Sequence, residues 1–181
     1  MTAFRFLGRL SLDLAVTGGE GPWGRIETLH GPADLRRWLA LCELAVAGAP
    51  VTAADLAAAK GLRRAIWNAA EALVEGGEPA AGDLAAINEA AARPPLAPGI
   101  DDSLARAWRA PRAEQALSDV ARDAIALLSD PASRARLKRC AGSNCELIFY
   151  DSSRPGRRRW CSTERCGDRM RARAYRERRL A

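Results

Sequence analysis

The sequence predicts an α+β protein in two parts: a mostly helical N-terminal body with a few strands, and a small cysteine-rich C-terminal module. Long alanine-rich stretches place apolar residues at steps of three and four, which indicates amphipathic helices. Shorter stretches alternate apolar and polar residues or lie next to turn residues, which favours short strands joined by turns. Four of the five cysteines lie in the last quarter of the chain. We therefore expect one domain at residues 1–133 and a second at residues 134–181.

The first expected element is a half-buried strand at Leu10–Val16, followed by a loop at Thr17–Pro22. Every second residue of the strand is apolar, so one face would lie on the core. Ser11 and Asp13 would point to the other side and be solvated. The only histidine, His30, has no partner in the pattern, and we expect a surface or capping residue without a catalytic role.

Two helices are expected next. Proline suits a first helical turn, so one helix begins at Pro32 and ends near Gly48–Pro50. Cys42 lies on its apolar stripe and is predicted to be a small core residue. A second helix begins at Thr52, which pairs with Asp55 as in a capped start, and continues to Gly76–Gly77. Gly61 is a candidate position at which this helix would divide into two.

The rest of the body is expected to contain a short helix, strands and a long helix. The short helix spans Asp83–Ala92. The segment Pro94–Pro111 is typical of a turn leading into one or two strands. A helix follows Pro111 and stops at Ser129–Pro131.

The four C-terminal cysteines form two pairs, Cys140 with Cys145 and Cys161 with Cys166. Each pair encloses four residues, and fifteen residues separate the pairs. Four thiolates close the tetrahedral shell of a structural zinc ion, and Gly142–Asn144 suits a tight turn. Two disulfides or four unrelated thiols are the alternative. We predict one structural Zn²⁺, with iron as the second choice of metal.

Between the cysteine pairs the sequence predicts a hairpin. Glu146–Tyr150 is strand-like, Asp151–Gly156 has turn chemistry, and Arg157–Trp160 can return antiparallel to the first strand. Ser162 or Thr163 could then cap a helix that has Cys166 in or near its first turn. A turn, a hairpin and a helix with two ligands at each end describe a treble-clef-like zinc finger. So small a unit depends on its metal for stability.

Positive charge is concentrated in the module. Residues 134–181 contain 15 Lys+Arg and 5 Asp+Glu, a balance of +10, whereas residues 1–133 contain 13 and 17, a balance of −4. Guanidinium groups bind phosphate bidentately, and basic helices follow nucleic-acid backbones. A solvated charged helix is the plainer interpretation. We predict nucleic-acid binding through one face of the C-terminal helix and through the hairpin: Arg169, Arg173, Arg176, Arg157, Arg158 and Arg159.

No pattern in the chain favours an enzyme or a membrane protein. There is no glycine-rich phosphate loop, and one histidine cannot supply a Ser-His-Asp or Cys-His set. No run of about 18 apolar residues occurs, and residues 1–6 lack the features of a signal peptide. We expect a cytoplasmic protein with no membrane partner. The sequence does not exclude a small-ligand pocket in the body, and it does not indicate the oligomeric state.

The module resembles the CGNR zinc finger, a family named for a Cys-Gly-Asn-Arg run at its fourth ligand. The resemblance is carried by six short segments: Arg139-Cys140, Cys145, Phe149–Arg154, Arg159–Ser162, Cys166–Arg169 and Tyr175–Arg178. The body resembles the ABATE domain that accompanies this finger, through Leu12–Thr17, Pro32–Leu39 and Leu62–Ile66.

This resemblance implies a bacterial, stress-related transcription regulator, in which the finger binds DNA and the body senses a small effector. Two residues depart from the family pattern. Asp168 stands where the family has asparagine, which weakens phosphate binding unless Asp168 caps the helix or pairs with Arg171 or Arg165. Val16 stands where asparagine is usual, which puts a polar ligand role of that position in doubt.

Two functions of different class remain. The first is a DNA-binding regulator whose affinity falls steeply as salt rises, because binding releases counterions. The second is a zinc-stabilised adaptor that docks a protein or a second copy without binding nucleic acid. RNA is a weaker variant of the first, because few aromatic residues are available to stack on bases.

Overall fold

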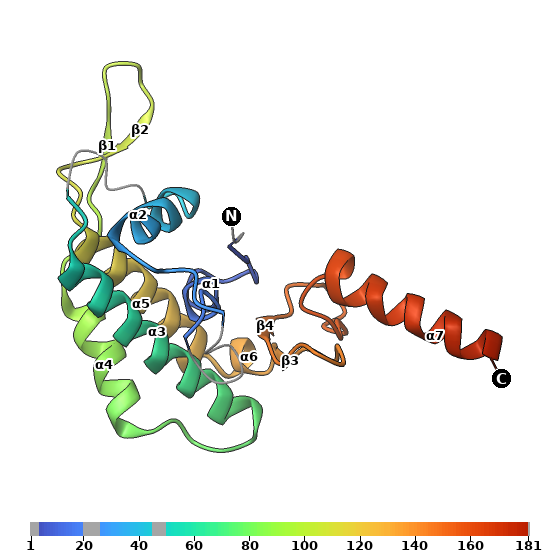
Figure 1. Cartoon of the computed structure of the whole chain (residues 1–181). Coiled ribbons are helices and arrows are strands. Elements are labelled where there is room, and N and C mark those ends of the chain that lie inside the picture. The colour runs from blue at the N-terminus through green and yellow to red at the C-terminus, as the bar shows by residue number, and fades with distance from the viewer. Residues whose placement is uncertain (1–3, 20–25, 45–49, 181) are drawn as a thin grey trace.

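The computed structural model describes residues 4–19, 26–44 and 50–180. Three helices, α3 (Ala53–Val74), α4 (Ala81–Ala92) and α5 (Ala113–Ser129), pack side by side in the body (Figure 1). The expected α+β class, mostly helical with a few short strands and a small cysteine-rich module, is confirmed. No helix in the described ranges combines the length and apolar character that crossing a bilayer requires.

The expected first strand is instead a short helix, α1 (Leu10–Ala15). Ser11 and Asp13, expected in solvent, are buried. The hydroxyl and backbone N–H of Ser11 donate to Asp123, at 2.6 and 2.8 Å, and Asp13 accepts from the backbone N–H of Leu7. Alternation therefore misled the prediction, because a helix buried on every side has no polar face.

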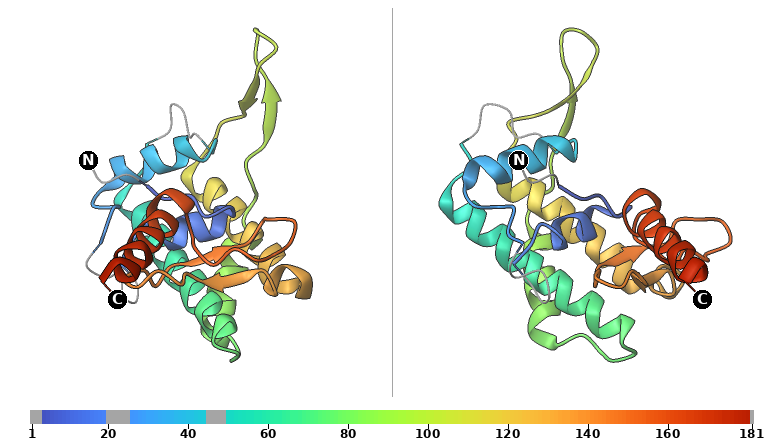
Figure 2. Two further views of the ribbon diagram at one scale, coloured as in Figure 1. Left: turned by 90° about the vertical axis from the view of Figure 1, so that its right-hand side faces the viewer. Right: turned by 45° about the vertical axis from the view of Figure 1, so that its right-hand side comes forward.

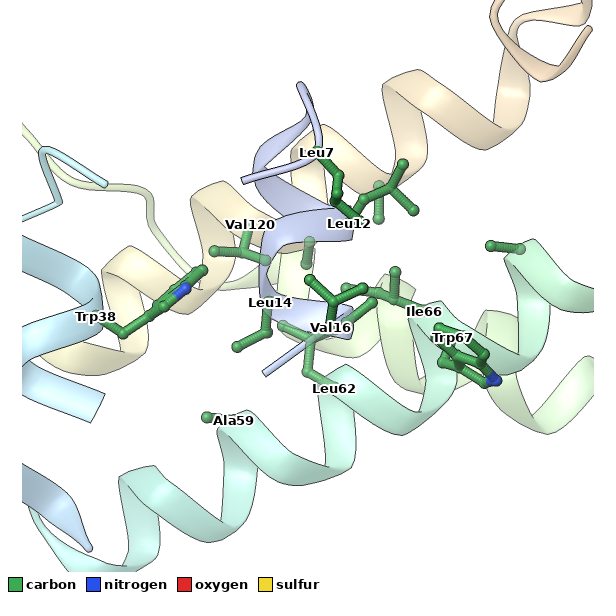
Figure 3. Packing of buried hydrophobic residues seen from close by; sticks show 14 of the residues in the cluster. Leu7, Leu12, Leu14, Val16, Trp38, Ala59, Leu62, Ile66, Trp67 and Val120 are labelled. Atoms are coloured by element: carbon green, nitrogen blue, oxygen red, sulfur yellow. The ribbon is translucent and has the colours of Figure 1, made fainter. Parts of the chain in front are cut away.

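The core surrounds α1. Leu12, Leu14 and Val16 lie among buried side chains of α3 and α5 (Figure 3). A further helix, α2 (Pro32–Leu41), adds Trp38, which is fully buried. Large apolar side chains with no exposed surface contribute the most to folding free energy, at roughly 25 cal/mol per Å² of apolar area removed from water.

The helix α2 begins where the sequence predicts but is shorter than expected. Pro32 is its first residue, and Cys42 lies just past its last residue, half-buried against the core. The helix ends at Leu41, and Glu43 has a positive φ of 59°, so the expected end near Gly48–Pro50 is wrong. Residues 45–49 lie outside the described residues. His30 is exposed, and its backbone N–H donates to Asp34 at 3.0 Å.

The helix α3 runs unbroken through Gly61, so the expected break there is wrong. Its start is as predicted: Thr52 is the N-cap, and its hydroxyl accepts from the backbone N–H of Asp55 at 3.2 Å. One glycine weakens a helix without ending it when the flanking turns are buried, and α3 is buried along one face.

A β-hairpin interrupts the helices. Its strands β1 (Pro98–Ile100) and β2 (Arg106–Trp108) pair antiparallel, with Pro98 opposite Trp108. The hairpin projects from the body (Figures 1 and 2). After α5, the short helix α6 (Pro131–Arg134) leads into the C-terminal module.

The module contains a second two-stranded sheet, but with a different partner from the one expected. The strand β4 (Ile148–Tyr150) pairs with β3 (Leu137–Arg139), which precedes the first cysteine, and the segment Arg157–Trp160 forms no strand. Arg159 still approaches the sheet region, because its carbonyl accepts from the N–H of Ala141 at 2.8 Å. The predicted hairpin of residues 146–160 is therefore corrected.

The sheet β3–β4 packs directly on the body. It contacts α1 and α3, and Leu147 and Phe149 are fully buried in the same core cluster as the body residues. The N–H of Tyr150 donates to the carbonyl of Leu7 at 3.4 Å. Two parts of opposite charge thus share one hydrophobic core.

Candidate metal centre and nucleic-acid interface

The four cysteines predicted to hold a metal converge on one point. The sulfur atoms of Cys140, Cys145, Cys161 and Cys166 all lie within 4.8 Å of one another, and all four residues are buried. Two of the Sγ–Sγ distances are 3.7 Å. A tetrahedron with zinc–sulfur bonds of about 2.3 Å has edges of about 3.8 Å. The cluster therefore has the dimensions of a four-thiolate site.

The first pair is positioned by the turn that the sequence predicts. The N–H of Cys145 donates to the carbonyl of Gly142 at 3.0 Å. A Cβ on Gly142 would lie 3.3 Å from Cβ of Cys145 and 3.3 Å from both Cβ and Sγ of Cys166. Only glycine fits there without displacing the cysteines, so this residue helps to shape the cradle.

The second pair is positioned by a capped helical turn. The hydroxyl of Ser162 accepts from the N–H of Arg165 at 3.3 Å, as one of the two predicted caps. A single π-helical turn, η2 (Thr163–Gly167), then carries Cys166, and the N–H of Gly167 donates to the carbonyl of Ser162 at 3.0 Å. π-Turns are rare and often mark functional sites. Here the wider turn places Cys166 beside Cys161.

The close packing of the four thiols gives them different pKa values. Hydrogen bonds from Cys161 and the other thiols lower the pKa of Cys145 to about 5. Burial, together with Cys145, raises the pKa of Cys166 to about 11, and the bond with Cys145 raises the pKa of Cys161 far above its usual value. One thiolate forms readily, but further thiolates repel each other in a buried site. A divalent cation removes that repulsion, which is the electrostatic basis of such centres.

A buried carboxylate organises the loop between the cysteine pairs. Asp151 accepts from Lys138 Nζ at 2.8 Å, from the N–H of Arg158 at 2.8 Å and from the hydroxyl of Ser153 at 2.6 Å. Burial alone would raise the pKa of Asp151, but these donors hold it well below its usual range. From the sequence Asp151 is predicted only to lie in a turn, because its partner Lys138 belongs to β3, a strand that the sequence does not predict.

The predicted helical arginines lie on α7 (Asp168–Leu180), which directly continues η2. Arg169, Arg173 and Arg176 are exposed and share one face at steps of four and three. Arg173 also pairs with Glu177, at 2.7 Å. The helix extends away from the body (Figures 1 and 2).

The predicted loop arginines have different surroundings. Arg157 and Arg159 are exposed, and Arg159 stacks over the Trp160 ring at 5.5 Å. Arg158 is half-buried: its guanidinium donates to the carbonyl of Cys161 at 2.8 Å and stacks over the Phe149 ring at 5.0 Å. Arg158 therefore also stabilises the loop that leads to the second cysteine pair.

The sequence pattern did not predict one ion-pair contact beside the metal cluster. Arg139, next to Cys140, pairs with Glu75 at 2.9 Å and with Glu71 at 3.4 Å, both in the last turn of α3 or just beyond it. Two carboxylates at a helix C-terminus are unfavourable for the helix dipole, so a nearby cation stabilises them. The sequence signal for this contact is the pair of glutamates, Glu71 and Glu75, four residues apart at the end of the helix. The contact links the body to the metal cluster.

Comparison with known families bears on this architecture. Residues 8–131 match the ABATE family model, whose description is "Putative stress-induced transcription regulator". The chain belongs to this family. Residues 136–179 match the CGNR zinc finger, and this ABATE protein therefore has the two parts that its sequence motifs suggested. No curated protein matches the chain.

The residues present fit the metal that the CGNR finger implies. The donor set is all sulfur, the sulfurs are enclosed, and the Gly142 cradle would be filled by any larger residue. Soft thiolate ligands select zinc, and a closed four-thiolate shell leaves no position for a substrate. This ABATE protein thus has a site for one structural zinc ion.

Proposed function

We propose that this protein is a zinc-dependent transcription regulator of the cytoplasm, whose finger binds duplex DNA while its body senses a small effector. Cys140, Cys145, Cys161 and Cys166 are the four zinc ligands in this proposal. The observation that carries it is α7, an exposed helix with six arginines that starts at the metal cluster and extends from the body.

The composition of α7 supports a polyanionic partner. The helix contains two acidic residues, Asp168 and Glu177, and no apolar stripe that could pack on the body. Among its described side chains only Met170 is half-buried, and the others are exposed. A helix that is polar all round gains little from burial in its own chain, so a partner that neutralises its charge would stabilise it.

Asp168 is compatible with this function. It is the first residue of α7, and its carboxylate pairs with Arg171. Negative charge suits a helix N-terminus, and Arg171 lies away from the face of Arg169, Arg173 and Arg176. The substitution of the family asparagine therefore leaves that face basic. With Arg157 and Arg159 it offers phosphate contacts from two segments of the finger.

The test is a salt titration of duplex-DNA affinity with zinc-loaded protein. Removal of one arginine that binds a phosphate reduces the slope of log K against log salt by about 0.9. We expect the Arg169/Arg173/Arg176→Ala variant to bind at least tenfold more weakly at about 100 mM salt, with a slope smaller by about 3. The variant loses only exposed side chains, so its zinc content and melting temperature are expected to stay unchanged.

A control of equal charge is Arg36/Arg64/Arg109→Ala, which removes three exposed arginines from the body. It should bind DNA as the wild-type does. If the two triple variants bind alike, the arginine face of α7 is not the DNA surface. If zinc-loaded wild-type protein shows no salt-dependent duplex binding at about 50 mM salt, the adaptor function replaces the regulator function.

A further inference from the structure

The three long helices of the body enclose a groove that the finger does not use. It has a volume of about 460 Å³ and is formed by the first half of α3, the C-terminal half of α4 and the start of α5. This volume lies in the range of small-molecule sites. The lining includes apolar side chains and four charged ones: Asp55, Glu89, Arg93 and Glu114.

The floor of the groove has a glycine that packing does not explain. Gly61 lies in the interior of α3, where glycine is the least favourable residue after proline. Its φ lies outside the left-handed region, and no atom beyond the helix's own backbone lies within 4 Å of where its Cβ would be. The backbone and the neighbours would both accept a larger residue. A larger side chain at position 61 would occupy the groove.

The charges of the groove are unevenly compensated. Arg93 pairs with Glu114 at 3.1 Å, and Asp55 accepts from Thr52 in the N-cap of α3. Glu89, by contrast, is exposed and makes no hydrogen bond or ion pair with any residue in the described ranges. It lies in the last turn of α4, where the helix dipole disfavours a carboxylate. Its carboxylate is therefore available to pair with a cationic group of a ligand.

We propose that this groove is a binding site for a small molecule with a protonated amine and a compact apolar body. The ammonium group pairs with Glu89, and the apolar part lies over Gly61, Leu62 and Leu117, of which both leucines are almost completely buried in the protein. A carboxylate ligand would be repelled by three acidic groups that face one arginine. This site deepens the proposed function, because it supplies the effector class that the body would sense.

The groove is also connected to the metal cluster by one rigid element. Gly61 and Leu62 lie in the first half of α3, and Glu71 lies near its other end, where it pairs with Arg139 beside Cys140. An unbroken helix moves as a unit. A ligand between α3 and α4 thus contacts the same element that holds the finger.

The experiment is isothermal titration calorimetry of the full zinc-loaded chain with three probes of one shape: 4-phenylbutylamine, 4-phenylbutan-1-ol and 4-phenylbutanoate. We expect the amine to bind at one site with a dissociation constant below about 1 mM, the alcohol at least tenfold more weakly, and the carboxylate not at all. Equal affinity for amine and alcohol, or no amine binding, would overturn the proposal.

Two variants locate the site. Gly61→Leu fills the groove and should raise the melting temperature while it reduces amine affinity at least tenfold. Glu89→Gln keeps the shape and should reduce amine affinity to that of the alcohol, whose own binding is unchanged. Amine binding to Gly61→Leu with wild-type affinity would place the site elsewhere. DNA affinity is measured separately, so failure of either proposal leaves the other standing.

Discussion

At the scale of single residues, burial and the partners of each carboxyl together decide the ionisation of the acidic side chains. Asp13 is buried in α1, and burial raises its pKa to about 7, with the nearby charge of Asp123 adding to the effect. Glu27 behaves oppositely: burial would raise its pKa, but Arg63 at 2.9 Å lowers it to about 2. One residue favours the fold at low pH and the other at neutral pH.

The first prediction concerns Asp13→Asn. The native carboxyl keeps its proton up to about pH 7, whereas the unfolded one loses it near pH 3.8, so the stability that Asp13 contributes falls as pH rises between these values. Asparagine has no such proton to lose. We expect Asp13→Asn to stabilise the protein by up to about 4 kcal/mol at pH 8 and much less at pH 5.

Urea unfolding at both pH values measures this effect. Asp102→Asn serves as the control, because Asp102 is exposed on the hairpin and should change stability at neither pH. Equal effects of Asp13→Asn at pH 5 and pH 8 would show that Asp13 is ionised in the folded protein.

At the scale of elements, the loop between the cysteine pairs depends on a single carboxylate. Asp151 has no exposed surface and accepts from donors of three residues, including Lys138 in β3. Removing one partner of a buried charged pair costs about 3–5 kcal/mol, because the other charge stays behind. Lys138 is only partly buried, so the lower value applies.

We therefore expect Asp151→Ala to destabilise the finger by about 3 kcal/mol and to weaken zinc retention against a competing chelator. Competition with a fluorescent zinc chelator measures the retention. Glu146→Ala, which removes an exposed acid from the same finger, should lose less than about 1 kcal/mol. Identical zinc retention in the two variants would contradict the role of Asp151.

Long helices, in which apolar residues recur at steps of three and four over several turns, were predictable from the sequence, and short buried elements were not. The start of α3 at Thr52 follows from one capping pattern. The helix α1 was missed because its polar residues are satisfied by Asp123 and Leu7, which are distant or unremarkable in sequence. The strand β3 was missed because Leu137–Arg139 is too short to show alternation.

The four cysteines of the cluster were predictable individually, because the spacing of the two pairs indicated that their thiols lie together, as they do in the fold. The groove was not, because periodicity assigns the alanines, the glycine and the charged residues that line it only to helices. Which helices face each other is a property of tertiary packing. The Arg139–Glu75 contact has the same origin.

At the scale of the whole molecule, the acidic body and the basic finger share one core but differ in what stabilises them. The body has its own large buried residues, such as Trp38 and Trp67, whereas the finger contributes mainly Leu147, Ile148 and Phe149. A core this small does not fold without a staple. The metal is expected to stabilise the fold of the finger and not that of the body.

Chelation of zinc should therefore unfold residues 137–180 and leave α3, α4 and α5 folded at a lower melting temperature. Hydrogen exchange with a zinc chelator, followed by zinc restoration, measures this by segment. Amides of β3, β4 and η2 should lose protection and regain it. Loss of protection throughout the chain would mean that the body depends on the finger.

Four sulfur atoms are expected to hold one zinc ion and thereby to position the arginine helix. X-ray absorption at the zinc edge, on reduced full-length protein with its metal content determined, measures the number and kind of the zinc ligands. We predict one zinc per chain with four sulfur neighbours at about 2.3 Å. Protein without zinc, or zinc with nitrogen or oxygen neighbours in place of sulfur, would show that the four cysteines do not form this site.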